Sequence, residues 1–153
     1  MNLNRLMKEN VEVCQNIKYK PSNRLTDENG DPQVWILRPL TTKEVDRITE
    51  KYTKRENVVE TNSRGKRKVR QEMKLDSYAV ADEMVLESLV EPSRADLENK
   101  DLQDSWGVLD PTDLLKAILS VPGEYNDLRE EVQRICGFDV DAANSLTEEA
   151  KKN

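Results

Sequence analysis

Residues 102–128 read LQDSWGVLDPTDLLKAILSVPGEYNDL and hold most of the organised apolar character of this chain. Asp110 and Pro111 predict a helix start, because Asp caps free backbone amides and Pro suits the first helical position. Apolar residues between 114 and 119 then recur at helical spacing until residues 121–123 interrupt them. The stretch is therefore either the heart of a small core or a surface that binds another protein.

Three more helices are predicted around that stretch. One covers about residues 122–136 and ends at a glycine, which suits the left-handed end of a helix. A second starts at Thr41, where Glu44 three residues later completes a capping box. The third, over about residues 76–89, starts with an Asp cap and carries the widest apolar stripe of the chain, so it is expected to be the central helix of the core.

The N-terminal part is predicted to contain a β-hairpin. Residues 17–20 form a short candidate strand, and residues 33–40 alternate in the way of a partner strand. The Asn29-Gly30 pair between them supplies the positive φ that a tight turn needs. A short helix is expected before the hairpin, over about residues 3–10.

Two segments lack apolar order. Residues 55–74 are highly charged and predict either a mobile loop or a long exposed hairpin, while residues 91–104 predict a polar connection. The elements together predict an α+β, mainly α-helical fold, in which an N-terminal β-hairpin packs with about four to five helices. We expect a single domain over residues 1–140, with a mobile charged loop at about 55–74, and a polar tail over 141–153.

The chemistry available to this chain is limited. It contains no histidine, so the commonest general base and the commonest metal ligand are both missing. Its 30 Asp and Glu lie on heavily charged segments, where a solvated face explains an acid pair better than a catalytic dyad. The turn with Asp27, Asn29 and Asp31 faintly resembles a calcium loop, but Arg38 stands where that loop needs a glutamate. We therefore expect no enzyme activity, no catalytic residue, no metal and no cofactor.

Charge and hydropathy argue against two further classes of protein. A net charge of −6 does not suit a molecule that binds nucleic acid over its whole surface. No apolar run approaches the roughly 18 residues that span a bilayer, and the N-terminal residues show no apolar segment for secretion. The two cysteines are far apart in the sequence and suit reduced thiols. The chain is expected in the cytoplasm, without a membrane as partner.

Two features of the sequence could have either a structural or a partner-binding role. The basic run from Arg64 to Arg70 could contact nucleic acid, but it holds no aromatic residue to stack on a base, which favours a solvated loop. Trp106 follows a polar, turn-rich approach and either caps the core or anchors an interface, because its ring is large and amphipathic.

Two blocks of the sequence resemble a known family. The first is VWILRPLTTKE at residues 34–44, and the second is LQDSWG at residues 102–107 with PGEY at residues 122–125. Together they are similar to the XkdN-like tail assembly chaperone family of phages and prophages of Gram-positive bacteria. The resemblance runs over about residues 2–138. Trp106 departs mildly from the family pattern, in which a tyrosine is as common at that position.

The resemblance implies a non-enzymatic function. Such proteins bind the long tape measure protein of a phage tail, keep it soluble while tail tube subunits assemble around it, and leave before the tail is finished. The implied partners are the tape measure protein and the tail tube protein, with self-association left open. The implied place of action is the cytoplasm of the bacterial host, with absence from the mature virion. The alternatives are a structural component of the tail or neck, or a nucleic-acid-contacting regulator that uses the basic run.

The resemblance transfers no site residue, so the expected partner contacts come from the residues themselves. They are the aromatic and apolar positions of the 102–128 stretch, some of which must also belong to the core: Trp106, Val108, Leu115, Leu119 and Tyr125. Among them Trp106 and Tyr125 are the main candidates, because both lie in turn-rich settings at opposite ends of the predicted helix.

Overall fold

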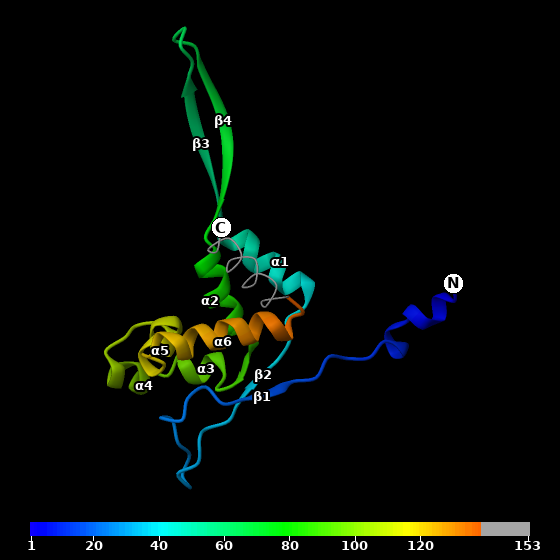
Figure 1. Ribbon diagram of the computed structural model, residues 1–153, viewed down its shortest axis with the longest axis vertical. Coiled ribbons are helices and arrows are strands. Elements are labelled where there is room, and N and C mark those ends of the chain that lie inside the picture. The colour runs from blue at the N-terminus through cyan, green and yellow to red at the C-terminus, as the bar shows by residue number, and fades with distance from the viewer. Residues whose placement is uncertain (139–153) are drawn as a thin grey trace, which may run out of the picture.

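The secondary structure is known for residues 1–138 from a computed structural model of the chain (Figure 1). Two short 3-10 turns, η1 (Leu3–Leu6) and η2 (Lys8–Asn10), come first. They are followed by β1 (Ile17–Tyr19), β2 (Trp35–Leu37), α1 (Thr42–Lys51), β3 (Thr53–Thr61), β4 (Arg67–Leu75), α2 (Ser77–Ser88), β5 (Leu89–Glu91), α3 (Arg94–Leu97), α4 (Lys100–Trp106), α5 (Pro111–Ile118) and α6 (Pro122–Ile135).

The strands form two separate antiparallel sheets. β2 is the middle strand of the first sheet and pairs with β1 on one side and β5 on the other. Its Trp35 and Leu37 face the core, in keeping with the alternation of side chains along a strand. β3 and β4 pair along their whole length, from Thr53 opposite Leu75 to Thr61 opposite Arg67, and form the second sheet.

The helix α2 lies at the centre of the body and contacts α1, α5, α6 and β5. It is apolar on several sides, as a helix with neighbours on several sides must be. The core around it is completed by leucines and other large side chains from every layer: Trp35, Leu37, Leu40, Ile48, Met84, Val85, Leu86, Leu89, Leu97, Leu114, Leu115, Leu119, Tyr125, Leu128 and Val132.

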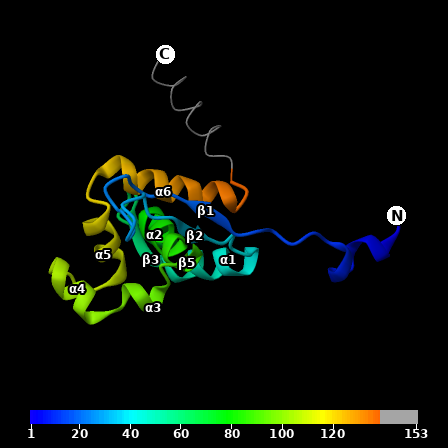
Figure 2. The ribbon, with the colours of Figure 1, turned by 90° about the horizontal axis from the view of Figure 1, so that it is seen from below.

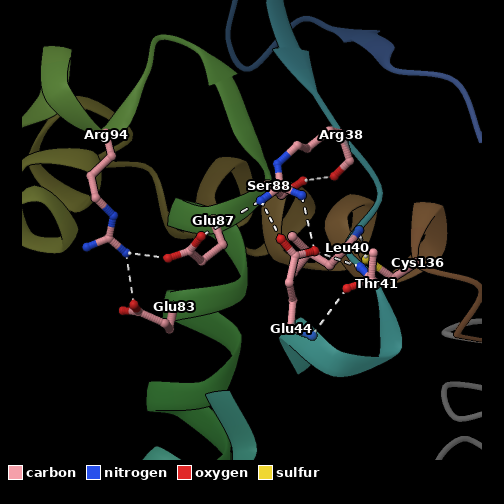
Figure 3. A network of polar contacts seen from close by, with 9 residues as sticks. All are labelled: Arg38, Leu40, Thr41, Glu44, Glu83, Glu87, Ser88, Arg94 and Cys136. Carbon is pink, nitrogen blue, oxygen red and sulfur yellow. Dashed lines mark hydrogen bonds and ion pairs between the residues drawn. The ribbon is translucent and has the colours of Figure 1, made fainter. Parts of the chain in front are cut away.

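The start of α1 is fixed by a polar cluster (Figure 3). Thr41 and Glu44 form the predicted capping box: the Glu44 amide donates to Thr41 Oγ1 at 3.3 Å, and the Thr41 amide donates to Glu44 Oε2 at 2.8 Å. The Arg38 guanidinium donates two hydrogen bonds to the same carboxylate, at 2.9 and 3.1 Å. The Arg38 guanidinium and the Thr41 amide together lower the pKa of the Glu44 carboxyl to about 2.

The same cluster ties β2 to α2 and α6. The Ser88 hydroxyl donates to the Arg38 carbonyl at 2.7 Å, and the Arg38 amide donates to the Ser88 carbonyl at 2.8 Å. The Leu40 amide donates to Cys136 Sγ at 3.4 Å. Burial raises the pKa of the Cys136 thiol, and this cysteine packs against the core as a small apolar side chain.

Glu44→Gln is expected to lower the free energy of unfolding by about 1–2 kcal/mol at about pH 7, after allowance for solvent screening of the partly exposed pair. Because the folded-state pKa is lowered, the stabilisation exists above the unfolded pKa and disappears as the pH falls toward about 2. Denaturant unfolding at pH values from about 7 to about 3 should therefore show the free energies of unfolding of the unmodified chain and of Glu44→Gln approaching each other as the pH falls. Glu50→Gln, an exposed site on the same helix, is the control; an equal difference at every pH would contradict the prediction.

The β3–β4 hairpin projects from the body along the long axis of the molecule (Figure 1). Two paired strands of this length reach about 30 Å. Asn62 organises the turn, since its Oδ1 accepts hydrogen bonds from the Arg64 and Lys66 amides at 3.0 Å each, and Gly65 supplies a φ of +79°. Of the two predicted alternatives for residues 55–74, the long exposed hairpin is therefore the one observed.

The predicted fold class, which is α+β but mainly α-helical with a single N-terminal hairpin and about four to five helices, is wrong in its amount of β structure and in its number of helices. Residues 1–138 form a mixed α+β fold with two sheets and six α-helices. The N-terminal hairpin gains a third strand, β5, from a position about fifty residues later in the sequence. Such pairing depends on tertiary contacts and leaves no local period in the sequence.

Two local predictions also need correction. Residues 91–104 are not a plain polar connection, because they contain α3 and most of α4, each started by a side-chain cap on Ser93 or Asn99. The predicted helix over residues 3–10 is two 3-10 turns without a buried residue, and both views show this segment leading away from the body (Figures 1 and 2). A helix needs a packed face to be stable at this length.

The division into a domain of residues 1–140 and a tail over 141–153 stays a prediction, because the tail lies outside the described residues. Within residues 1–138, no helix has the length and the apolar character needed to cross a membrane.

Candidate partner-binding site

Trp106 lies beside an open groove of about 950 Å³. The groove is bounded by the β1–β2 loop, by β5 and the end of α3, and by α4 and the end of α5. Its apolar lining comes from side chains that are far apart in the sequence: Leu25, Val34, Trp35, Pro92, Leu97, Leu102, Trp106 and Ile118. Three of these, Val34, Leu102 and Trp106, are among the exposed hydrophobic residues of the chain. The groove is therefore an apolar surface that solvent reaches.

Local caps hold Trp106 at this surface. Asn99 starts α4 by accepting the Leu102 amide at 2.9 Å, and Trp106 ends the helix four residues after Leu102, so the two side chains share one face. Gly107 then adopts a φ of +66°, and the Val108 amide donates back to the Gln103 carbonyl at 3.1 Å, which closes a Schellman-type end. Trp106 is 47% exposed.

The charge around the groove has one sign. Four acidic residues, Asp27, Glu28, Glu91 and Asp96, belong to its lining, and none of the described residues that line it is Lys or Arg. An exposed apolar surface with an acidic border suits a partner segment that is apolar on one face and basic at its sides.

The other four predicted contact residues do not line this groove. Val108 is half-buried against the core. Leu115, Leu119 and Tyr125 are buried within it, and Leu115 is completely inaccessible. Of the five predicted contact residues, only Trp106 lines the groove, and it is the only one of the five that is classed as exposed.

Tyr125 is buried because its hydroxyl belongs to a polar cluster on Asp82. The hydroxyl donates to Asp82 Oδ1 at 2.8 Å, Arg129 donates to the same oxygen at 2.7 and 2.9 Å, and Lys116 Nζ lies 3.0 Å from Oδ2. The Arg129 guanidinium also lies 4.6 Å from the centre of the Tyr125 ring. Burial opposes the charged form of Asp82, but these donors outweigh it and lower the pKa of the carboxyl. Both oxygens of the Asp82 carboxylate already have donors within the protein, so the cluster stabilises the fold.

Two other candidate features of the sequence, the acidic turn and the basic run, can be placed within residues 1–138. Within residues 1–138, no group of three or more His, Cys, Asp or Glu is placed to hold a metal ion. The turn with Asp27 is closed by that side chain itself, since Asp27 Oδ1 accepts the Asn29 and Asp31 amides at 2.8 and 3.0 Å. The basic run from Arg64 to Arg70 forms the turn and the first part of β4.

Sequence reasoning missed most of the groove. Val34 and Leu102 looked like ordinary members of a strand and a connection, and Glu91 looked like the start of a loop. A usable signal was present in α4, where Leu102 and Trp106 stand four residues apart between the Asn99 cap and Gly107. That spacing predicts a short helix with one apolar face.

Comparison with known proteins identifies the family. The family model described as "Phage XkdN-like tail assembly chaperone protein, TAC" matches residues 3–151, which is nearly the whole chain. The chain belongs to the XkdN-like phage tail assembly chaperone family. This agrees with the resemblance found in the two sequence blocks, and the structure shows that the first of those blocks, residues 34–44, contains β2 and the capped start of α1.

Two relatives of this family member come from Bacillus subtilis strain 168. The phage-like element PBSX protein XkdN is 33% identical over 138 residues, covering 90% of this chain and 85% of the relative. The uncharacterised protein YqbN is 29% identical over 140 residues, with 92% and 85% covered. A crystal structure of YqbN matches with a TM-score of 0.69 at 22% identity, over 91% of this chain and 98% of that one, which shows a shared fold.

Proposed function

We propose that this XkdN-like chaperone binds the phage tape measure protein through the groove at Trp106 while the tail is being built. It acts without catalysis, in the cytoplasm of the host cell. The observation that supports this proposal is the combination of a half-exposed indole with an acidic border on an open apolar groove. The tail tube protein is the second expected partner, because tube subunits assemble around the same tape measure chain.

The groove suits a helical segment of the partner. An amphipathic helix places an apolar stripe into such a surface, and a large aromatic side chain is the usual anchor. The Trp106 ring would cover part of that stripe, while Glu28 and Glu91 would face Lys or Arg at its edges. Several bound copies would shield a long helical chain that otherwise aggregates.

Co-expression tests the proposed function. The tape measure protein encoded in the same gene cluster should be mainly insoluble when it is made alone and soluble when this chain is made with it. The two proteins should then co-purify. An insoluble tape measure protein in the presence of the folded chaperone would overturn the proposal.

Trp106→Ala should weaken capture of the tape measure protein about 30-fold, the effect of removing an interface anchor worth about 2 kcal/mol. The matched control is Phe138→Ala, because Phe138 is 49% exposed but does not line the groove. Capture is measured by titrating immobilised chaperone with a soluble tape measure fragment. Equal losses in the two variants would mean that exposure of an aromatic ring matters and the groove does not.

The finished virion separates the chaperone from a structural subunit. A chaperone that leaves before completion should be present in tail intermediates and absent from purified particles. Mass spectrometry of both samples measures this directly. A fixed number of copies in purified particles would favour the alternative of a tail or neck component.

A further inference from the structure

The β3–β4 hairpin has two chemically different faces. Directly opposed residues of an antiparallel pair point to the same side, and successive residues alternate. The residues of the first side, which we call the apolar face, are Thr53, Arg55, Asn57, Val59 and Thr61 of β3 with Arg67, Val69, Gln71, Met73 and Leu75 of β4. The residues of the second side are Lys54, Glu56, Val58 and Glu60 with Lys68, Arg70, Glu72 and Lys74.

The second side balances much of its charge within the hairpin. Arg70 pairs with Glu60 at 2.9 Å and with Glu72 at 2.6 Å, and Lys74 pairs with Glu56 at 2.9 Å. These pairs bring opposite charges together on a surface that faces solvent. They use all three glutamates of residues 53–75, so the hairpin has no acid left to balance the cations of the apolar face.

The apolar face is open to solvent and positively charged. Its charged residues are Arg55 and Arg67, and within residues 1–138 neither forms an ion pair. The adjoining turn adds two more cations, at positions 64 and 66. Four apolar side chains of this face are more than half exposed: Val59, Val69, Met73 and Leu75.

The hairpin receives little cover from the rest of the molecule. It projects away from the body (Figure 1), and none of the residues 53–75 is buried. An isolated pair of strands is only marginally stable in water, and it becomes stable when a third strand or a helix packs with it. Exposed apolar surface of this kind is typical of a protein interaction site. The hairpin therefore has the character of a surface that a partner covers.

The dimensions of the apolar face suit an α-helix. The two strands pair along nine positions, so the ribbon is about 30 Å long and about 10 Å wide. A helix with its side chains is about 10–12 Å across, and about 20 residues of it span 30 Å. One helix laid along the ribbon would contact both strands. An added third strand would instead lie beside the ribbon and leave the apolar face open.

The charge of the hairpin decides which helix suits it. Residues 53–75 hold eight Lys or Arg and three Glu, and positions 64–68 hold four cations and no acid. A helix with Asp or Glu beside its apolar stripe would meet these cations favourably, whereas a basic helix would be repelled. The groove at Trp106 has an acidic border. The hairpin and the groove therefore suit partner segments of opposite charge.

The hairpin and the groove are far enough apart to be occupied together. Figure 1 shows the hairpin at one end of the long axis and the β1–β2 loop, which borders the groove, at the other. A partner chain that is held at one of the two surfaces reaches the other at a high effective concentration. Two weak contacts can therefore give one firm complex.

We propose that the apolar face and basic turn of the hairpin form a second binding site, which takes an acidic amphipathic helix of the tape measure protein while the groove at Trp106 takes a basic one. This inference rests on the proposed function, because it assumes the same partner. A helix along the ribbon covers about 300 Å² of the hairpin, well below the roughly 800 Å² per partner of stable complexes. The hairpin alone therefore binds weakly, with a dissociation constant of about 10–1000 μM.

Peptides from the tape measure protein test the assignment of charge. Overlapping peptides of about 25 residues, long enough for a helix of 30 Å, are titrated with the full chain and with two variants. One variant is Trp106→Ala. The other reverses the basic turn by Arg64→Glu, Lys66→Glu and Arg67→Glu, and thermal unfolding verifies that both remain folded.

The two variants should lose different peptides. Peptides that no longer bind the variant of the turn should have an apolar stripe with an excess of Asp and Glu, and they should still bind Trp106→Ala. Peptides lost in Trp106→Ala should carry an excess of Lys and Arg. The inference is overturned if no peptide depends on the turn, or if both variants lose the same peptides.

Neighbouring valines provide a matched control for the apolar contact. Val59→Thr with Val69→Thr removes two directly opposed apolar side chains from the apolar face and keeps residues that favour strands. This variant should bind the acidic peptides about 10-fold more weakly. Val58→Thr changes a side chain that points to the second side, and it should alter binding less than about twofold. Equal losses in the two variants would contradict a contact at the apolar face.

Hydrogen exchange shows what covers the hairpin. The amides of residues 53–75 should exchange rapidly in the free chain at every concentration, and at least about tenfold more slowly when an acidic peptide is bound. Protection that grows with the concentration of the chain alone would assign the apolar face to a second copy. Protection by a DNA duplex of about 30 base pairs, and not by the peptides, would assign it to nucleic acid. Either result would overturn the inference.

Capture of the whole tape measure protein separates this inference from the proposed function. If capture depends on Trp106 and is unchanged in the variants of the hairpin, the second site is wrong and the proposed function stands. If the chain neither captures the tape measure protein nor binds any of its peptides, both are wrong. If capture depends on both surfaces, the variant that combines Trp106→Ala with the reversed turn should lose more affinity than either variant alone.

Discussion

Leu115→Ala is expected to lower the free energy of unfolding by about 3–4 kcal/mol. Leu115 lies on α5 within the hydrophobic core and is completely inaccessible to solvent. Truncation removes the transfer energy of the buried carbons and leaves a cavity, which together give losses of about 2–5 kcal/mol in other proteins. For a domain of this size, the midpoint of thermal unfolding should fall by about 10 °C.

The control for that prediction is Leu109→Ala. Leu109 lies in the loop before α5 and is 92% exposed, so its truncation should change stability by less than about 0.5 kcal/mol. Denaturant unfolding of the two variants beside the unmodified chain measures the difference. A loss at Leu109 equal to that at Leu115 would contradict the assignment of α5 to the core.

Leu115→Ala and Trp106→Ala together separate packing from binding. Leu115→Ala should reduce capture of the tape measure protein only in proportion to the fraction of unfolded chain. Trp106→Ala should do the reverse, with a stability loss of about 1–2 kcal/mol and a large loss of capture, because half of its ring is already in solvent. Capture measured well below the unfolding temperature distinguishes the two effects.

Asp82→Asn is expected to lower the free energy of unfolding by about 2–3 kcal/mol. Asp82 balances Arg129 and Lys116 and accepts the Tyr125 hydroxyl, and its side chain is 12% exposed. The amide has the same size but no charge, so the guanidinium of Arg129, which is 17% exposed, loses its counter-charge. Removal of one partner from a buried ion pair destabilises by about 3–5 kcal/mol, and the partial exposure of Lys116 reduces that figure here.

The stabilisation by the Asp82 charge depends on pH and is lost in acid. The folded-state pKa of Asp82 is lowered, so its charge stabilises the fold at all pH values above the unfolded pKa of about 4 and ceases to do so as the pH falls through the folded value. The difference between Asp82→Asn and the unmodified chain should be constant between about pH 7 and pH 5 and should shrink in stronger acid. Asp46→Asn, at an exposed position on α1, should show no difference at any pH.

Much of the helical structure can be predicted from the sequence, because helix starts depend on neighbours three residues away. Thr41 with Glu44, Asp76 and Asp110 with Pro111 each cap a helix where they were expected to. The last turn of α6 also ends as predicted, with Gly137 at a φ of +88°. These are local hydrogen-bonding requirements, which any short stretch of chain reveals.

The extent of the β structure cannot be predicted from local sequence in the same way. The highly charged strand β4 has only a sparse apolar alternation, at Val69, Met73 and Leu75, and it forms because β3 pairs with it along nine positions. β5 contains three residues and becomes a strand through its partner β2. Pairing between distant segments supplies these strands, so single-sequence patterns underestimate them.

The sequence by itself determined the family, the main helix starts and the choice of Trp106 as a contact candidate, since each depends on residues that are close together in the chain. Only the tertiary structure decided which apolar side chains are exposed. Tyr125 and Trp106 looked equivalent in sequence, yet Asp82 and Arg129, more than forty residues apart, bury the first ring, while the second remains at the edge of an acidic groove. Burial is set by neighbours in space, and for Leu115, Leu119 and Tyr125 those neighbours come from distant parts of the chain.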